Sequence, residues 1–126
     1  MNEATQSDFV VGLATTDTTL IASNPDDLVA FEKHDGDANI DFVTRTNGAE
    51  TATDTGVDVV NNTAVVLEFY WDGDDTVYAY VNGVQKAAHT ANLCQDEELT
   101  PSIAFLTGEA LSHTMTVDWV RCIQFN

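Results

Sequence analysis

Carboxylates are the most abundant groups in this sequence that could carry chemistry. The chain has 21 Asp and Glu among 126 residues, so glycoside hydrolysis is the first reaction to consider. It needs two carboxyl groups about 5 to 9 Å apart, one with a raised pKa, and on a β-sandwich such groups usually alternate along one strand. Glu68 stands alone among apolar neighbours, and the other carboxylates fall in turns. We therefore expect a protein that is not an enzyme.

The histidines and cysteines do not form a recognisable catalytic or metal-binding pattern. His34, His89 and His113 fall on separate predicted strands, and no G-x-S-x-G turn is present. Neither Cys94 nor Cys122 has a partner at zinc-ligand spacing. Acidic residues follow Cys94 and would raise its thiol pKa, which disfavours a nucleophile. Free thiols are the expected state, and a single Cys94–Cys122 bridge stays open.

Two acidic turns are candidates for a cation site. Asp72-Gly73-Asp74-Asp75 and Asp35-Gly36-Asp37 both concentrate oxygen ligands. Their spacing does not match the D-x-D-x-D-G loop, and Asp and Gly are favoured in tight turns for backbone geometry alone. We expect no cofactor, and a weak surface calcium site stays open.

Aromatic residues are the features that could bind sugar. Tyr70, Tyr78, Tyr80, Trp71 and Trp119 would serve if they formed an exposed platform beside polar groups. Aromatic residues are also common in strands. The sequence favours rings that fill the core or a subunit contact, and it leaves a glycan site at Tyr70, Tyr78 and Tyr80 as the alternative.

The sequence shows strand patterns along its whole length, and these predict where the residues above lie. Runs of β-branched and aromatic residues alternate with polar ones between Gly, Asn and Asp clusters. The predicted strands are Asp8–Thr15, Leu28–His34, Ile40–Thr46, Ala64–Trp71, Thr76–Val81, Val84–His89, Ser102–Thr107 and His113–Phe125, with a weaker one at Glu50–Thr53. The pattern predicts one all-β domain over residues 1–126, with residues 1–7 as an N-terminal arm.

Turn residues give the order of several strands. Asn82-Gly83 between apolar strands is the strongest short hairpin signal, and the loops at 34–37 and 46–48 predict two further hairpins. Asn24-Pro25-Asp26-Asp27 could start one helical turn. The apolar run from Val65 to Trp71 is typical of a strand in the middle of a sheet.

The charge balance restricts the partners. A formal net charge of −17 disfavours nucleic acid and anionic membranes, which bind through Lys and Arg. No run of about 20 apolar residues is present to span a bilayer. Salt screens self-repulsion, so the charge predicts either adaptation to a salty medium or an acidic surface kept for solubility.

The C-terminal predicted strand has no evident neighbour within the chain. His113–Phe125 contains Val117, Trp119 and Ile123, and in a closed sandwich it would pair with a strand near the N-terminus. The first predicted strand begins only at Asp8. An unpaired apolar strand is an aggregation hazard, so we expect a neighbouring chain, or an N-terminal segment outside this sequence, to cover it.

The run from Val66 to Lys86, with its F-Y-W-D-G and V-Y-A-Y-V-N-G-V motifs, resembles the central hairpins of concanavalin A-like (laminin G-like) jelly rolls. Leu99–Phe105 and Thr114–Arg121 resemble the late strands of that family. Together with Phe9–Leu13, Asp17-Thr18-Thr19 and Ile40–Val43, they are similar to structural proteins of tailed phages.

The resemblance implies an antiparallel two-sheet jelly roll that lacks its first strand. It also implies a virion protein at the capsid surface, a decoration or cement subunit whose partners are the major capsid protein and copies of itself. The catalytic carboxylates of the glucanase members do not occur at the matching positions. A carbohydrate-binding module of a phage tail or of a secreted protein is the alternative, because fold likeness does not by itself deliver function.

Overall fold

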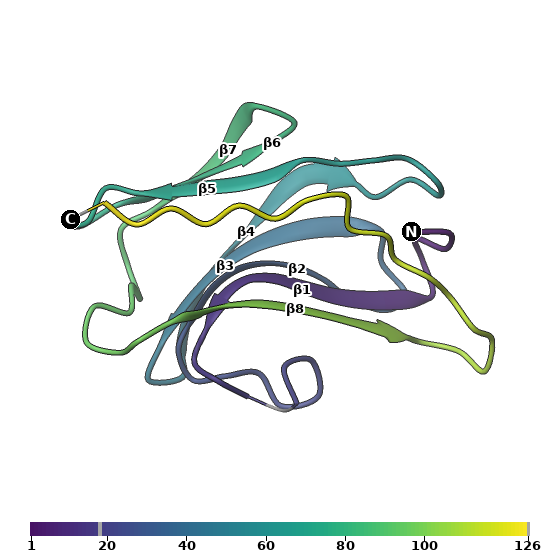
Figure 1. Cartoon of the computed structure of the whole chain (residues 1–126), viewed down its shortest axis with the longest axis horizontal. Coiled ribbons are helices and arrows are strands. Elements are labelled where there is room, and N and C mark those ends of the chain that lie inside the picture. Colours follow the sequence, from purple (N-terminus) through teal and green to yellow (C-terminus); the bar gives the residue numbers. More distant parts are fainter. Residues whose placement is uncertain (18, 126) are drawn as a thin grey trace.

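The computed structural model describes residues 1–17 and 19–125 (Figure 1). Thr18, which belongs to one of the motifs above, lies outside the described residues. The strands are β1 (Ser7–Ala14), β2 (Leu28–Lys33), β3 (Asn39–Thr46), β4 (Ala49–Asp58), β5 (Leu67–Trp71), β6 (Val77–Val81), β7 (Val84–His89) and β8 (Thr100–Thr107). No helix among the described residues is long and apolar enough to cross a membrane.

The strands form two antiparallel sheets, which confirms the predicted all-β class. The larger sheet has the order β4-β3-β2-β1-β8, and the smaller has the order β5-β6-β7. The chain crosses between the sheets after β4 and returns after β7 (Figure 1). Because β5 and β8 are both edge strands, the order of strands leaves one side of the layered structure open.

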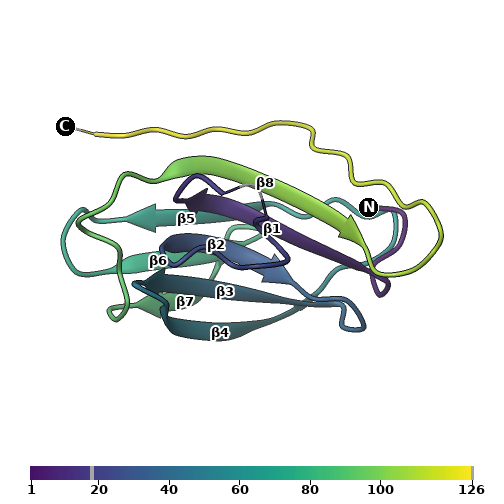
Figure 2. The same ribbon diagram turned by 90° about the horizontal axis from the view of Figure 1, so that it is seen from below.

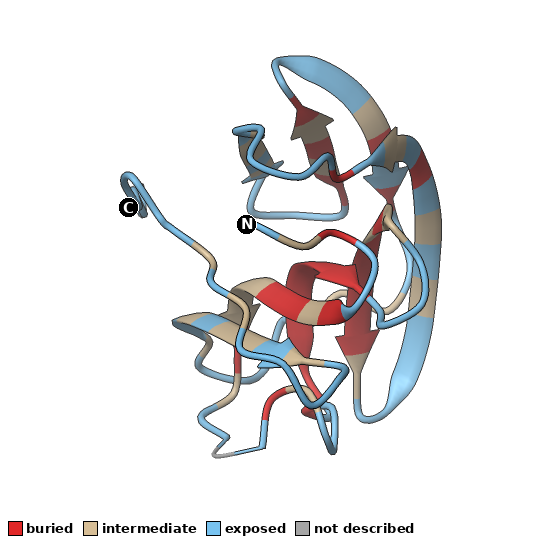
Figure 3. Cartoon of the chain, turned by 90° about the vertical axis from the view of Figure 1, so that its right-hand side faces the viewer, coloured by how far each residue is buried: buried red, intermediate tan, exposed pale blue. Residues whose placement is uncertain are grey.

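Strand alternation builds the core between the sheets. Phe31 and Phe42 face inward from the larger sheet with ring centroids 5.0 Å apart, and Phe69 of the smaller sheet lies 6.1 Å from Phe42. Phe42 is fully buried. In Figure 3 the buried residues concentrate on the strands of the larger sheet and on the strands that face them.

A second apolar cluster covers the outer face of the larger sheet. Val10, Leu28, Ala30 and Val43 point away from the first core and pack under Leu20. The connection between β1 and β2 supplies Leu20, so this loop acts as a lid on the sheet. The larger sheet is thus covered on both faces, which explains why every residue of β2 is buried.

The predicted hairpin turns are confirmed. Asn82 and Gly83 have φ of 51° and 78°, and Asn47 and Gly48 have φ of 48° and 78°. Two consecutive positive φ values are the signature of the type I′ turn, which suits the twist of the flanking strands. These turns set the β6–β7 and β3–β4 pairings.

One local prediction was too short and two were wrong. The predicted weak strand at Glu50–Thr53 forms, but it is part of the longer β4, which pairs with β3 along almost its whole length. The helical turn at Asn24-Pro25-Asp26-Asp27 does not form, because its backbone bonds elsewhere: the Asp26 carbonyl accepts from Gly48 N at 2.9 Å and the Pro25 carbonyl accepts from Arg45 at 3.1 Å. The strand from Val65 to Trp71 is β5, an edge strand and not a central one.

The prediction that His113–Phe125 forms a strand of a sheet is also wrong, although the segment is extended. None of its residues is assigned to a strand, and in Figures 1 and 2 it runs alone past the body of the protein. Its start is held by a pair of bonds with Asn2: Asn2 N donates to the Thr114 carbonyl at 3.1 Å, and Thr114 N donates to Asn2 Oδ1 at 2.7 Å. Beyond that anchor, the backbone of the segment is not hydrogen-bonded to any strand among the described residues.

Phe42 tests the core. Replacing Phe42 with Ala removes a buried ring that touches both sheets, and we expect the free energy of unfolding to fall by about 3–5 kcal/mol. Chemical denaturation followed by tryptophan fluorescence measures this loss. Leu106→Ala is the control, because Leu106 is 50% exposed on β8 and its truncation should cost less than about 1 kcal/mol. Equal losses in the two variants would contradict the assigned core.

Candidate binding site: an apolar groove beside strand β5

A large concavity lies between β5 and the C-terminal segment, which we define as residues 113–125. Its volume is about 1770 Å³, beyond the roughly 300–1,000 Å³ of pockets that hold small molecules. We call it the open groove. Its walls are β5 (Leu67–Trp71), the inner face of β1 and β8 (Phe9, Val11, Ile103), and the C-terminal segment from Met115 onward.

The floor of the open groove is the core itself. Phe9 and Phe31 belong to the buried cluster between the sheets and also line the groove. Ile103 points to the same inner side, since it pairs with Val11 across β1 and β8, yet it is 42% exposed. A core residue left this open indicates that a layer of side chains is lacking on this side.

The two long walls run in the same direction. β5 and the C-terminal segment both proceed from right to left in Figures 1 and 2. The edge of β5 that faces away from β6 has no strand beside it among the described residues. An inserted strand antiparallel to β5 would therefore be antiparallel to the C-terminal segment as well, and it could form ladders with both.

The C-terminal segment exposes most of its apolar side chains. Val117, Trp119 and Ile123, the predicted contact residues, are 47%, 63% and 51% exposed. Val120 and Phe125 are exposed as well. Exposed apolar side chains gathered on one segment make that segment a candidate contact site.

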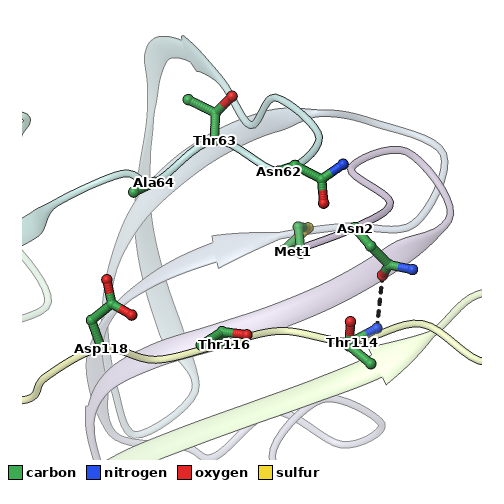
Figure 4. Close-up of a pocket in the computed structure, with 8 residues that line it drawn as sticks. All are labelled: Met1, Asn2, Asn62, Thr63, Ala64, Thr114, Thr116 and Asp118. Carbon is green, nitrogen blue, oxygen red and sulfur yellow. Dashed lines mark hydrogen bonds between the residues drawn. The ribbon is translucent and has the colours of Figure 1, made fainter.

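A small polar cavity of about 250 Å³ adjoins one end of the groove. Figure 4 shows it between the N-terminus, the connection before β5 and the start of the C-terminal segment. Its lining residues are Met1, Asn2, Asn62, Thr63, Ala64, Thr114, Thr116 and Asp118. The Met1 carbonyl accepts from Asn62 N at 2.8 Å, so the predicted N-terminal arm is fastened to the groove and not free.

The three tyrosines gather on the outer face of the smaller sheet, away from the core. Tyr70 pairs with Tyr78 across β5 and β6, and their rings stack at 6.5 Å with an interplanar angle of 18°. Tyr80 lies two residues further along β6 on the same face. The register directs Leu67, Phe69 and Trp71 inward, so the three tyrosines do not fill the core. A subunit contact, the other placement that the sequence favours for these rings, stays a prediction.

The histidines and cysteines are dispersed. His89 is buried between Thr44 and Thr53, whose hydroxyls lie 2.9 Å and 2.8 Å from its two ring nitrogens. Both cysteines are free thiols, Cys94 buried and Cys122 exposed. Burial is the main cause that raises the pKa of the Cys94 thiol, and the charge of Asp27 adds to it. The direction agrees with the sequence prediction, but the acidic residues that follow Cys94 are not the main cause.

The two acidic turns use their carboxylates within the turns. Asp72 Oδ1 accepts from Asp74 N at 2.9 Å and from Thr76 N at 3.1 Å, and Asp37 Oδ1 accepts from Asn39 N at 3.0 Å. Within residues 1–17 and 19–125, no three His, Cys, Asp or Glu side chains are grouped as metal ligands. The weak calcium site stays a prediction.

One carboxylate lies in the interior and was not singled out from the sequence. Glu32 is 3% exposed, and its Oε1 has no hydrogen-bond partner. Burial raises the pKa of Glu32, while the charge of Arg45 opposes the shift. Its neighbour Lys33 is buried too, and Nζ donates to backbone carbonyls, among them that of His34 at 3.0 Å. Strand alternation gave no signal for either residue, since both sit in a fully buried strand.

No family model, curated protein or solved structure matches the chain.

His89 gives a pH-dependence test. Burial lowers the pKa of His89, so the folded chain keeps the ring neutral while the unfolded chain takes up a proton below about pH 6.5. The unfolded state then binds more protons, and stability falls as the pH drops below that value toward the folded pKa. We expect His89→Gln to flatten this part of the stability–pH curve, measured by urea denaturation.

Leu106→Ala is the control for that experiment. Leu106 is 50% exposed on β8 and carries no titratable group, so its replacement should leave the slope of the wild-type curve unchanged. A His89→Gln curve parallel to the wild-type curve below about pH 6.5 would contradict the assignment of that slope to His89.

Proposed function

We propose that the protein is a non-enzymatic structural subunit of a virion, a capsid decoration or cement protein of a tailed phage. The observation that carries this proposal is the open groove with its exposed C-terminal segment. The opening is larger than a typical small-molecule pocket, and its lining includes apolar side chains of β1, β5 and β8, so it suits contacts between protein chains. The major capsid protein and further copies of the chain are the proposed partners.

The finer fold assignment belongs to the same proposal. A concanavalin A-like jelly roll would contain one more strand beside β5, and the open groove lies where that strand would fit. The like direction of β5 and the C-terminal segment supports this assignment, because adjacent strands of an antiparallel sheet alternate in direction. The motif resemblance between Val66 and Lys86 supports it independently of the groove.

The acidic surface fits a role outside the shell. The net charge of −17 would keep the exposed face away from the packaged nucleic acid, while the C-terminal segment, whose Asp118 and Arg121 cancel, makes the contacts. In this arrangement the protein stabilises the capsid by burying apolar strand surface across subunits, with no reaction to catalyse.

Particle composition tests the proposal. We expect quantitative mass spectrometry of purified virions to find the chain at a fixed copy number relative to the major capsid protein. Particles without the chain should still assemble but lose their contents at a lower temperature. Absence of the chain from purified particles would contradict a virion role.

A glycan-binding module is the second candidate, and the tyrosine face favours it. Stacked, partly exposed rings of Tyr70 and Tyr78, with Tyr80 beside them, offer the apolar face on which a sugar ring can lie. Gln85 and Glu68 pair with Tyr80 and supply polar groups next to it.

A glycan array separates the two candidates. If sugar binding is the function, Tyr70→Ala should abolish the signal, because it removes the more exposed ring of the stacked pair. Leu106→Ala should not change it, because Leu106 lies on β8 of the other sheet. Binding that is equal in both variants, or absent from the wild type, would remove this candidate.

A further inference from the structure

The open groove lacks one strand, and the chain holds a segment of the right kind to fill it. We propose that the C-terminal segment of a second copy inserts between β5 and the C-terminal segment of the first, so that two copies exchange these segments reciprocally. The inference deepens the proposed function and rests on it in one respect, namely that copies of this chain contact each other.

The direction of the strands supports a symmetric pair. A two-fold axis that passes between two copies of the C-terminal segment, perpendicular to the strands, makes them antiparallel. Since β5 runs parallel to the segment of its own chain (Figures 1 and 2), the segment of the second copy is then antiparallel to both. The order across the joint sheet becomes β5, second segment, first segment, second β5. One contact therefore fills both grooves, as a closed two-fold interface requires.

The side-chain pattern of the segment suits insertion. From Met115 onward the odd-numbered positions are apolar except for Arg121, and they include Val117, Trp119 and Ile123. Most of the even-numbered positions are polar, although Val120 is apolar. Successive residues of a strand point to opposite faces. An inserted segment can thus place its odd-numbered side chains over the exposed core residue Ile103 and direct its polar ones outward.

Charge decides which part of the chain can contact another copy. Residues 1–109 hold 20 of the 21 acidic residues and three of the four basic ones, so the whole net charge of −17 lies there. The only Asp, Glu, Lys or Arg among residues 110–126 are Asp118 and Arg121, so the formal net charge of this range is zero. The segment can therefore enter a second copy without bringing charge, and its Arg121 would approach Glu68, Glu97 or Glu98 at the rim of the groove.

Self-association of the full chain tests the proposal. We expect sedimentation velocity to find a dimer that strengthens between about 0.1 M and about 1 M NaCl, because salt shortens the Debye length from roughly 10 Å to roughly 3 Å and screens the repulsion between the acidic bodies. Trp119→Asp should weaken the dimer by about tenfold or more. Val84→Asp is the matched control: Val84 is 58% exposed on the β6–β7 hairpin, outside the groove, and the variant should dimerise like the wild type.

Amide hydrogen exchange on the wild-type chain provides a readout that needs no variant. Dilution from dimer to monomer should remove protection from β5 and from residues 113–125 together, and leave β2 and β3 unchanged. A wild-type monomer at all concentrations, a dimer that Trp119→Asp leaves intact, or equal weakening by Val84→Asp would overturn the exchange. A monomer that still occurs at fixed copy number in particles would refute the exchange and leave the virion role standing. A dimer absent from particles would do the reverse.

Discussion

An open strand edge beside an uncovered core is the constraint on which the rest of this structure depends. The backbone groups of β5 that face away from β6 have no strand to bond to among the described residues, and the side chains next to them belong to the core. One extended segment placed beside β5 would satisfy both, because it would supply the hydrogen bonds and cover the apolar surface. The C-terminal segment likewise is extended without being part of a sheet, and it exposes apolar side chains.

The rest of the fold positions two walls of this opening. Phe31, Phe42 and Phe69 fix the two sheets against each other, and the loop that carries Leu20 covers the outer face of the larger sheet. The bonds between Asn2 and Thr114 hold the start of the C-terminal segment at one end of the groove. A strand that enters the groove therefore finds β5 and the floor of the groove already positioned.

Much of the fold could be predicted from the sequence, because turn chemistry and alternation are local. The Asn47-Gly48 and Asn82-Gly83 turns set two hairpins, and the inward set of each strand follows from period-two patterning. The edge position of β5 could not be predicted, since a strand apolar on both faces is typical of a sheet centre. Here the apolar outer face belongs to a tyrosine cluster. The register of that hairpin also decided that Tyr78 and Tyr80 lie outside, and one residue of slip would have reversed it.

The sequence indicated the candidate site only through a predicted C-terminal strand that had no evident neighbour in the chain. Val117, Trp119 and Ile123 were predicted to lie at a contact, and they are exposed along the groove, but the space between them and β5 depends on the separation of two segments far apart in the sequence. The most direct measurement is an isotope-filtered NOE experiment on a mixture of labelled and unlabelled chains. The account predicts contacts between β5 of one copy and residues 113–125 of the other. Spectra in which β5 contacts only residues of its own chain would contradict it.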